Sequence, residues 1–394
     1  MLIGYAQNVI TPSLEKPVYL AGFDQNRRAV DVHDDLYVRA LALRTSDRTL
    51  VLCGLDLIGF FRPSMQEVVH QVHARLGDEM PEILIASLHP HHGPDTMGLW
   101  GPDARTSGID PVYMAELKEK IAAVILAALE DLRPAAGMKA TSVHVPGVAK
   151  NARNPEIVDD ELTVLQFLDE RGKPLASLFD FPCHPEVLWE HNPHITADYP
   201  GVLRQAVEQE TGAACIFFSG ALGGMMTPDV RDHSFEEAEA MGRRLAEKGL
   251  KALAGAESLP LPAISLQKRE IKVKLTNPLY KLAFWRKLLP DMRDRKGFIQ
   301  SEVNLIKIGD LWFAAVPGEL LPKLGLHLKT RMLAAGARVA AVIGLANDEL
   351  GYMLPAEDFH YPLNPFKPGR HYEETNSIGK SIGPAVVEAV EALL

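Results

Sequence analysis

The sequence predicts an α/β protein in which mixed β-sheets are flanked by helices. Short apolar runs bounded by turn residues alternate along the 394 residues with longer amphipathic stretches, a pattern typical of this class. Residues 303–308 and 311–316 flank Gly309-Asp310, a pair suited to a tight hairpin turn. Polar side chains follow several of the strand-like runs, so we expect an active site at the carboxyl ends of the strands.

The other expected strands are short apolar runs bounded by turn residues. They cover residues 49–59, 82–89, 162–168, 175–184, 213–220 and 338–348. Helices are indicated at residues 63–77, 110–132 and 234–254 by apolar residues that recur on one face. Ser64 with Glu67, and Ser234 with Glu237, have the spacing of capping boxes. Asn277-Pro278 is a helix start.

Composition excludes several classes of protein. With 47% hydrophobic and 23% charged residues, the chain is expected to be globular. A net charge of -10 without a basic tract argues against a nucleic-acid partner or an anionic membrane surface. No run has the length of a membrane span. The first residues do not resemble a secretion signal, and the three cysteines form no spaced framework, so we expect a cytoplasmic protein.

The segment SLHPHHGP, residues 87–94, contains three histidines directly after an expected strand. Since Pro90 follows His89, we expect an extended backbone at His89, and His91 would then point to the same face. His184, Glu319 and Asn347-Asp348 also follow strand-like runs, which suggests one shared site. The alternative is a polar loop with a capping histidine.

Two histidines and a carboxylate from separate strands form a familiar catalytic zinc arrangement with an open position for water. Zinc lowers the pKa of that water toward neutrality. Alternatively, His184 is a strand-end histidine with satisfied hydrogen bonds, and Glu319 is a carboxylate at a helix N-terminus. Spacing alone does not separate these two interpretations.

Several segments resemble, in the same order, the catalytic domain of the neutral, non-lysosomal ceramidases, zinc-dependent amidases that hydrolyse N-acyl sphingosine. Residues 89–94 resemble that family's His-Thr-His-Ser-Gly-Pro, and VPGE, ending at Glu319, matches its Val-Pro-Gly-Glu. LANDELGYMLP, residues 345–355, resembles Ala-Asn-x-Tyr-x-x-Tyr. The remaining similar segments are residues 22–43, 152–185, 195–201 and 371–379.

The resemblance implies a site that holds one Zn²⁺ per chain. Its implied ligands are His89, His184, Glu319 and Tyr352. It further implies His91 as a second-shell or transition-state partner, Arg153 in the site and Asp198 close to it. Arg153 would hold developing negative charge or a carboxylate product.

The chain also departs from the family pattern. The family's Gly-Asp-x-Ser-Pro-Asn reads GMMTPD here, so Met225 replaces the aspartate while Thr227 keeps a hydroxyl that could serve in catalysis. The family's C-terminal immunoglobulin-like domain has no counterpart before Leu394. We therefore expect residues 1–394 to be a single catalytic domain.

The main functional hypothesis is zinc-dependent hydrolysis of an amide bond in a small-molecule or lipid-like substrate. The alternatives are a zinc hydrolase of a smaller ester, lactone or amide, and a non-catalytic binding protein with the same fold. A phosphoesterase with two metals could use Asp56, Asp95 and Asp198. In the stretch 277–298, Trp285 lies on an apolar stripe that could contact substrate, or could pack on the core or on a second subunit of a homo-oligomer.

Overall fold

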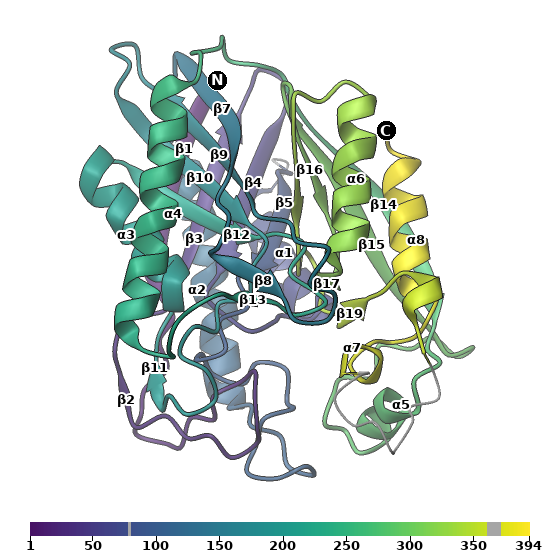
Figure 1. The fold of residues 1–394 in the computed structure, drawn as a ribbon. Helices are drawn as coiled ribbons and strands as arrows, with labels where there is room; N and C mark the ends of the chain where they lie inside the picture. The colour runs from purple at the N-terminus through teal and green to yellow at the C-terminus, as the bar shows by residue number, and fades with distance from the viewer. Residues whose placement is uncertain (78–79, 361–371) are drawn as a thin grey trace.

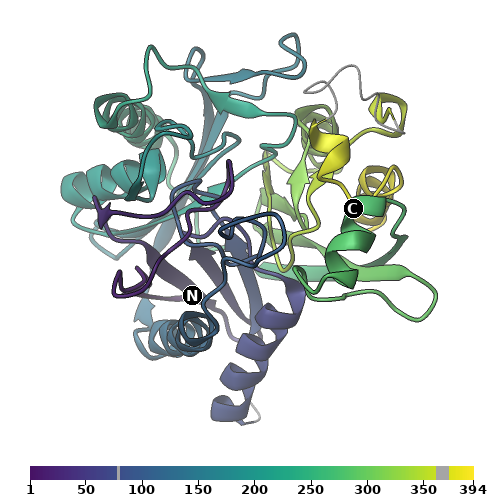
Figure 2. The same cartoon turned by 90° about the horizontal axis from the view of Figure 1, so that it is seen from below.

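The computed structural model describes residues 1–77, 80–360 and 372–394. Its three main sheets contain parallel and antiparallel strands, and helices cover their outer faces (Figures 1 and 2). The α/β prediction is confirmed. The first residue of the 371–379 segment, His371, lies outside the described residues.

The first sheet has the order β5-β4-β3-β1-β6, with β4 and β5 parallel. Its strands are β1 (Leu2–Val9), β3 (Tyr37–Arg44), β4 (Thr49–Leu55), β5 (Glu82–Ser87) and β6 (Arg133–Pro134). The helices on its outer face are α1 (Arg62–Leu76) and α2 (Pro111–Glu130). The apolar residues of both helices pack against this sheet, as the amphipathic pattern requires.

The second sheet has the order β12-β10-β9-β7, with β10 and β12 parallel. Its strands are β7 (Gly137–His144), β9 (Glu161–Leu168), β10 (Pro174–Phe181) and β12 (Ala214–Ser219). Its outer face is covered by α3 (Asp198–Thr211) and α4 (Phe235–Gly255).

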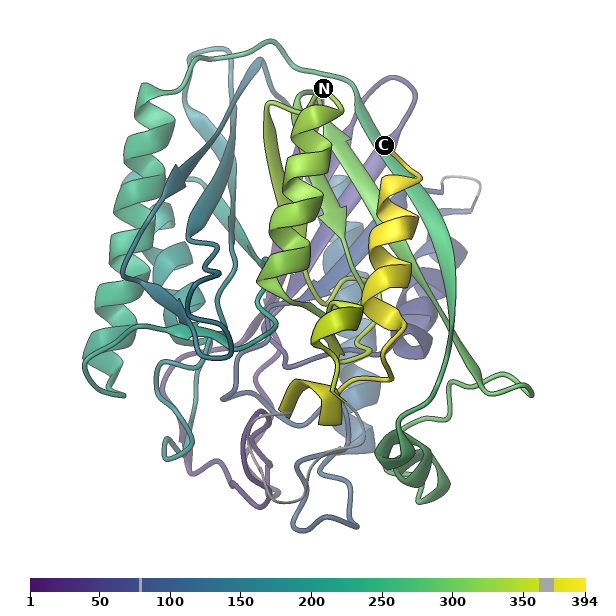
Figure 3. The same ribbon diagram turned by 45° about the vertical axis from the view of Figure 1, so that its right-hand side comes forward.

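The third sheet has the order β14-β15-β16-β18, with β16 and β18 parallel. Its strands are β14 (Ile264–Lys274), β15 (Phe298–Ile308), β16 (Leu311–Ala315) and β18 (Val339–Ile343). Helices α5 (Pro278–Trp285), α6 (Pro322–Ala334) and α8 (Ile382–Glu391) contribute to its outer apolar cluster, and α6 and α8 run along the outside in Figure 3. The hairpin at Gly309-Asp310 is confirmed, because Ile308 pairs with Leu311.

The inner faces of the three sheets share one apolar core. Leu52 from the first sheet, Leu178 from the second and Phe313 from the third belong to this cluster, and all three are fully buried. Strands β4, β10 and β18 are buried on both faces, which explains why they read as near-continuous hydrophobic runs.

Three short strand pairs lie beyond the ends of the main sheets (Figure 1). They are β2 (Asp31–Val32) with β11 (His194–Ile195), β8 (Ala149–Asn151) with β13 (Met226–Pro228), and β17 (Glu319–Leu320) with β19 (Tyr352–Met353). The 3₁₀ turn η1 (Ala356–Asp358) and the short helix α7 (Tyr372–Thr375) follow. The β17–β19 register sets Glu319 opposite Tyr352.

The helix starts follow the sequence signals with one exception. Ser234 caps α4, since its Oγ accepts the Glu237 N–H, and Asn277 caps α5 in the same manner. The capping box at Ser64 is wrong, because α1 begins at Arg62, whose N–H is held by Asp348 (3.0 Å). This tertiary contact starts the helix earlier than the local signal indicates.

Among the described residues, no helix is long and apolar enough to cross a membrane. Cys53, Cys183 and Cys215 are all buried and unpaired with one another.

Candidate active site

The segments that follow the parallel strands are tied together by hydrogen bonds. The Ser87 N–H donates to the Leu345 carbonyl (3.1 Å), and the Ser219 hydroxyl donates to the Leu88 carbonyl (2.7 Å). The Gly344 N–H donates to the Ser219 carbonyl (2.8 Å). The carboxyl ends of β5, β12 and β18, one from each sheet, therefore meet at one place.

The backbone of His89 is not extended, which contradicts the expectation from Pro90. Strand β5 ends at Ser87, and His89 has a φ of 71°. The His89 N–H donates to the Leu57 carbonyl (3.0 Å), and its Nδ1 lies 2.5 Å from the Ile58 carbonyl. These two bonds to one neighbouring segment hold a backbone conformation that a non-glycine residue rarely adopts.

Three histidines form a buried cluster. Nitrogens of His89, His91 and His184 all lie within 4.8 Å of one another. Glu319 joins them, since its Oε2 lies 3.0 Å from His184 Nε2 and 3.7 Å from His89 Nε2. The expectation of one site shared by these strand ends holds for His89, His184 and Glu319.

The orientation of two of these rings suits a metal. The Nδ1 of His89 faces the Ile58 carbonyl, and the Nδ1 of His184 lies 2.9 Å from the Met226 carbonyl. A ligating histidine usually donates its other ring N–H to such an acceptor, which leaves Nε2 for the ion. Two imidazole nitrogens and a carboxylate oxygen at one point are a donor set that zinc accepts.

The charges in the cluster are strongly coupled. Burial would raise the pKa of Glu319, but the adjacent His89 and His184 outweigh it and lower that pKa. Burial lowers the pKa of His89 to about 3. For His184, burial also acts downward, but the hydrogen bond to Glu319 and the charge of Glu186 raise the pKa to about 9. A metal ion bound here would compete with a proton for His184.

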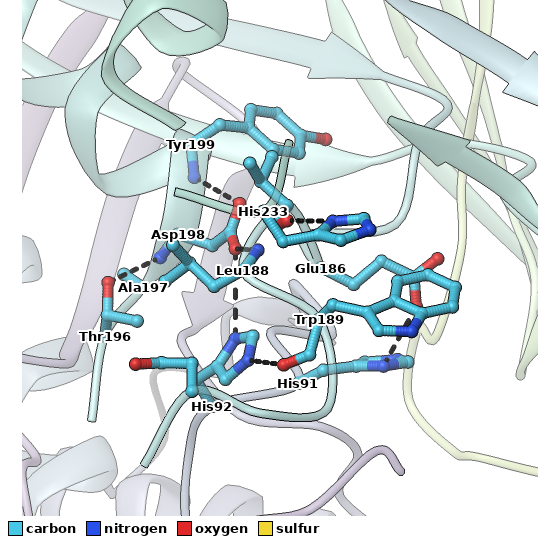
Figure 4. Close-up of polar contacts among 12 residues, drawn as sticks. His91, His92, Glu186, Leu188, Trp189, Thr196, Ala197, Asp198, Tyr199 and His233 are labelled. Atoms are coloured by element: carbon cyan, nitrogen blue, oxygen red, sulfur yellow. Dashed lines mark hydrogen bonds and ion pairs between the residues drawn. The ribbon is translucent and has the colours of Figure 1, made fainter. Parts of the chain in front are cut away.

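Glu186 is a site residue that sequence reasoning missed. Its buried Oε2 lies 3.1 Å from His91 Nδ1 (Figure 4). Burial would raise the pKa of Glu186, but His91 and the other nearby donors hold it at about 2. A carboxylate two positions after His184 was the available signal, but its partner lies far away in the sequence.

Tyr352 lies beside the cluster, as the β17–β19 register requires. Its hydroxyl donates to the sulfur of Met225 (3.5 Å). Met225 thus lies next to Tyr352.

A small cavity of about 50 Å³ opens onto these groups. His89, His91, Glu319 and Tyr352 line it together with residues that the sequence did not indicate. These include Met97, Leu99, Trp100, Tyr280, Glu349 and Tyr372. Its wall is therefore largely apolar and aromatic, and two carboxyl groups belong to it.

Arg153 lies outside that cavity, in a neighbouring hollow lined also by Asn154 and Lys323. Its guanidinium contacts Glu373 at 2.6 Å and Glu374 at 2.9 Å, both in α7. Its charge is thus balanced by two carboxylates of the protein.

Three other expected site residues do not line the cavity. Thr227, on β13, is buried. Asp198 accepts the N–H groups of Tyr199 (2.7 Å) and Leu188 (3.4 Å) and lies 3.8 Å from His92 Nδ1 (Figure 4). Trp285 is 75% exposed at the end of α5.

The side chains of Asn347 and Asp348 bond to neighbouring elements of the fold and do not line the cavity. The Asn347 Oδ1 accepts the Ile85 N–H (2.9 Å), and Asp348 binds Ser301 in addition to the N–H of Arg62. The expectation that Asn347 and Asp348 belong to the shared site is wrong, because both side chains join neighbouring elements.

Two of the carboxylates expected for a second metal, those of Asp56 and Asp95, are bound by other groups of the protein. Asp56 contacts Arg204 through two bonds of 2.7 Å, and Asp95 accepts four backbone N–H groups, including that of Gly98 (2.6 Å). In the described part of the chain, His89, His91 and His184 form a group close enough to share one ion, so His91 offers a third nitrogen besides those of His89 and His184. Asp56 and Asp95 are bound by groups of the protein itself, and the two-metal phosphoesterase stays a hypothesis.

A scan against protein-family models and a search of curated protein sequences gave no match. Solved structures similar to this chain include neutral ceramidase from Pseudomonas aeruginosa and a ceramidase complexed with C2. Each superposes on this chain with a TM-score of 0.80 and 17% sequence identity. The matched region covers 100% of this chain, 74% of the first structure's chain and 75% of the second's. The sequence resemblance is thus confirmed at the level of the fold: this chain has the fold of neutral ceramidase.

Proposed function

We propose that this protein is a zinc-dependent hydrolase that cleaves an amide bond, as ceramidases do. The observation that carries the proposal is the convergence of His89 Nε2, His184 Nε2 and Glu319 at one buried point. One Zn²⁺ per chain would be held by these three residues and Tyr352. When bound, zinc supplies Lewis acidity, which lowers the pKa of water toward neutrality and polarises a carbonyl group.

His91 moves the proton in this proposal. Glu186 faces its Nδ1 and keeps the proton on that atom, so Nε2 is free to accept a proton and return it. Within the described part of the chain, neither ring nitrogen of His91 has a hydrogen-bond partner, and Nδ1 makes only the ionic contact with Glu186. A catalytic role of Thr227 stays a prediction.

Arg153 serves the site by holding α7 through Glu373 and Glu374. Tyr372, the first residue of α7, lines the cavity, so this contact positions one of its walls. Binding of a carboxylate product by Arg153 stays a prediction, as do contacts of Asp198 and Trp285 with substrate.

The cavity of about 50 Å³ next to the clustered groups has room for one functional group, so the reacting group of a substrate fits there. The smaller amide, ester or lactone stays an alternative to ceramide. Three buried free thiols agree with a reducing, cytoplasmic location.

Metal content and turnover, measured together, test the proposal. Wild-type protein purified without chelators should contain about one zinc per chain. His184→Ala should lose both zinc and hydrolysis of short amides and esters. His91→Ala should keep zinc and lose roughly 10²- to 10⁴-fold in kcat.

His327→Ala is the matched control, because His327 is exposed on α6. Full turnover by metal-free protein would contradict the proposal. Absence of metal after zinc has been offered back would favour the non-catalytic binding protein.

A further inference from the structure

Glu349 is a buried carboxyl group in the wall of the active-site cavity. It is 2% exposed and lines the cavity together with Glu319.

In the described part of the chain, only one carboxyl oxygen of Glu349 has a hydrogen-bond partner. Its Oε1 accepts the Gly351 N–H (2.9 Å), whereas Oε2 has no hydrogen-bond partner in the described part of the chain. The carboxyl also has little freedom, because Gly59 packs against its Cγ: a Cβ on Gly59 would lie 2.9 Å from that atom. Buried polar groups are nearly always paired, so an unpaired carboxyl oxygen at a cavity indicates a missing donor.

The surroundings of Glu349 suit a cation. Trp100, Tyr280 and Tyr372 line the same cavity, and aromatic rings attract ammonium groups. Burial and the charge of Glu319 raise the pKa of Glu349 well above its usual range. A positive charge next to the carboxyl would relieve both effects.

We infer that Glu349, with the aromatic wall of the cavity, binds a protonated amine. In the reaction, this amine would be part of the substrate, close to the scissile bond. That second statement rests on the proposed function, whereas the amine site itself does not. The substrate class is then a small amide or ester that carries a free amino group.

Binding of simple probes tests the inference on the full-length protein. Propylamine, protonated at neutral pH, and 1-propanol, its neutral counterpart of similar size, would be titrated calorimetrically into wild type, Glu349→Gln and Glu357→Gln. Glutamine keeps an oxygen for the Gly351 N–H but removes the charge. Glu357 is an exposed glutamate outside the cavity, and its variant is the control.

The wild type and Glu357→Gln should bind propylamine more tightly than propanol. Glu349→Gln should bind the amine roughly ten- to a hundredfold more weakly, the range for a hydrogen bond to a charged group. Equal binding of amine and alcohol by the wild type would overturn the inference, and this comparison needs no variant. Unchanged amine binding by Glu349→Gln would also overturn it.

Thermal unfolding tests whether Glu349 only stabilises the fold. Without a ligand, Glu349→Gln should melt at or near the wild-type temperature, because burial already favours the neutral carboxyl and glutamine keeps an acceptor for the Gly351 N–H. A clear fall in its Tm would mean that the carboxyl stabilises the fold, against the inference. Glu349→Asp keeps the charge and should still prefer the amine.

Zinc content and hydrolysis, measured on the same samples, separate this inference from the proposed function. Amine binding that depends on Glu349 in a protein without zinc or turnover would support the amine site and refute the hydrolase. Turnover without a preference for the amine would support the hydrolase and refute the amine site.

Discussion

The three clustered histidines differ in what faces the Nδ1 of each ring. Backbone carbonyls face Nδ1 of His89 and His184, whereas the Glu186 carboxylate faces Nδ1 of His91. A carbonyl orients a metal ligand, and a carboxylate also stabilises a ring that gains a proton. This difference separates the proposed ligands from the proposed proton carrier.

Replacing Glu186 should therefore impair chemistry and spare the metal. Glu186→Gln removes the charge beside His91, so we expect kcat to fall by roughly 10²-fold or more, with zinc content unchanged. Steady-state kinetics and metal analysis of the same sample check this. Loss of zinc together with activity would show that Glu186 supports the metal site instead.

Asp198 should make the folded protein less stable as pH rises. Burial raises the pKa of this carboxyl to about 7, and Asp34 and Glu186 act in the same direction, while His92 faces it. The folded protein keeps this proton where the unfolded chain has lost it, so the contribution is complete below about pH 4 and disappears by about pH 7. It amounts to at most about 4 kcal/mol.

Urea unfolding between these pH values measures the effect. Asp198→Asn cannot ionise, so its stability should decline less than that of the wild type over this range. Parallel declines in both proteins would contradict the prediction.

Among the elements, α5 shows how one helix divides into a packed and an exposed side. Phe284 is buried, and the Arg293 guanidinium lies 5.2 Å from its ring centre. Trp285 is exposed, as are Leu279 and Leu282. The apolar stripe expected from the sequence thus lies partly on the surface.

Neighbouring substitutions in α5 should differ sharply in stability. Phe284→Ala leaves a cavity and should cost about 3 kcal/mol or more. Trp285→Ser should change the free energy of unfolding by about 0.5 kcal/mol or less. Chemical denaturation of both variants checks the pair, and a similar loss in both would mean that Trp285 is covered.

For the whole molecule, the site depends on three sheets that meet around a common core. His89, His184 and Glu319 follow β5, β10 and β16, one from each sheet. A metal bound between these segments would link the sheets and favour the folded state by mass action.

Removal of zinc should therefore lower the Tm of the whole protein. Free zinc at a thousandfold excess over Kd adds about 4 kcal/mol, which a chelator should abolish. Scanning calorimetry with and without chelator measures the difference. His184→Ala should show no such difference, and an equal shift in that variant would point to zinc bound elsewhere.

The sequence by itself determined the elements and the residues that follow them. Apolar runs and turn residues act locally, so the hairpin at Gly309-Asp310 and the caps at Ser234 and Asn277 could be read directly, as could the buried strands β4, β5, β9, β10, β12, β15, β16 and β18. Strands β1, β7 and β14 were not predicted, because their faces are partly exposed and interrupt the apolar runs. The motif order further indicated His89, His184, Glu319 and Tyr352, and the tertiary structure brings these side chains together.

Only the tertiary structure decided what each polar group contacts. Glu186 contacts His91, and Arg153 contacts Glu373 of α7, although these residues are far apart in the chain. The position of Glu349, whose Oε2 has no hydrogen-bond partner in the described part of the chain, is likewise set by the tertiary structure. The same holds for the positive φ of His89, where hydrogen bonds to a neighbouring segment overcome the local preference before Pro90. Such contacts depend on how the three sheets pack, which no local pattern encodes.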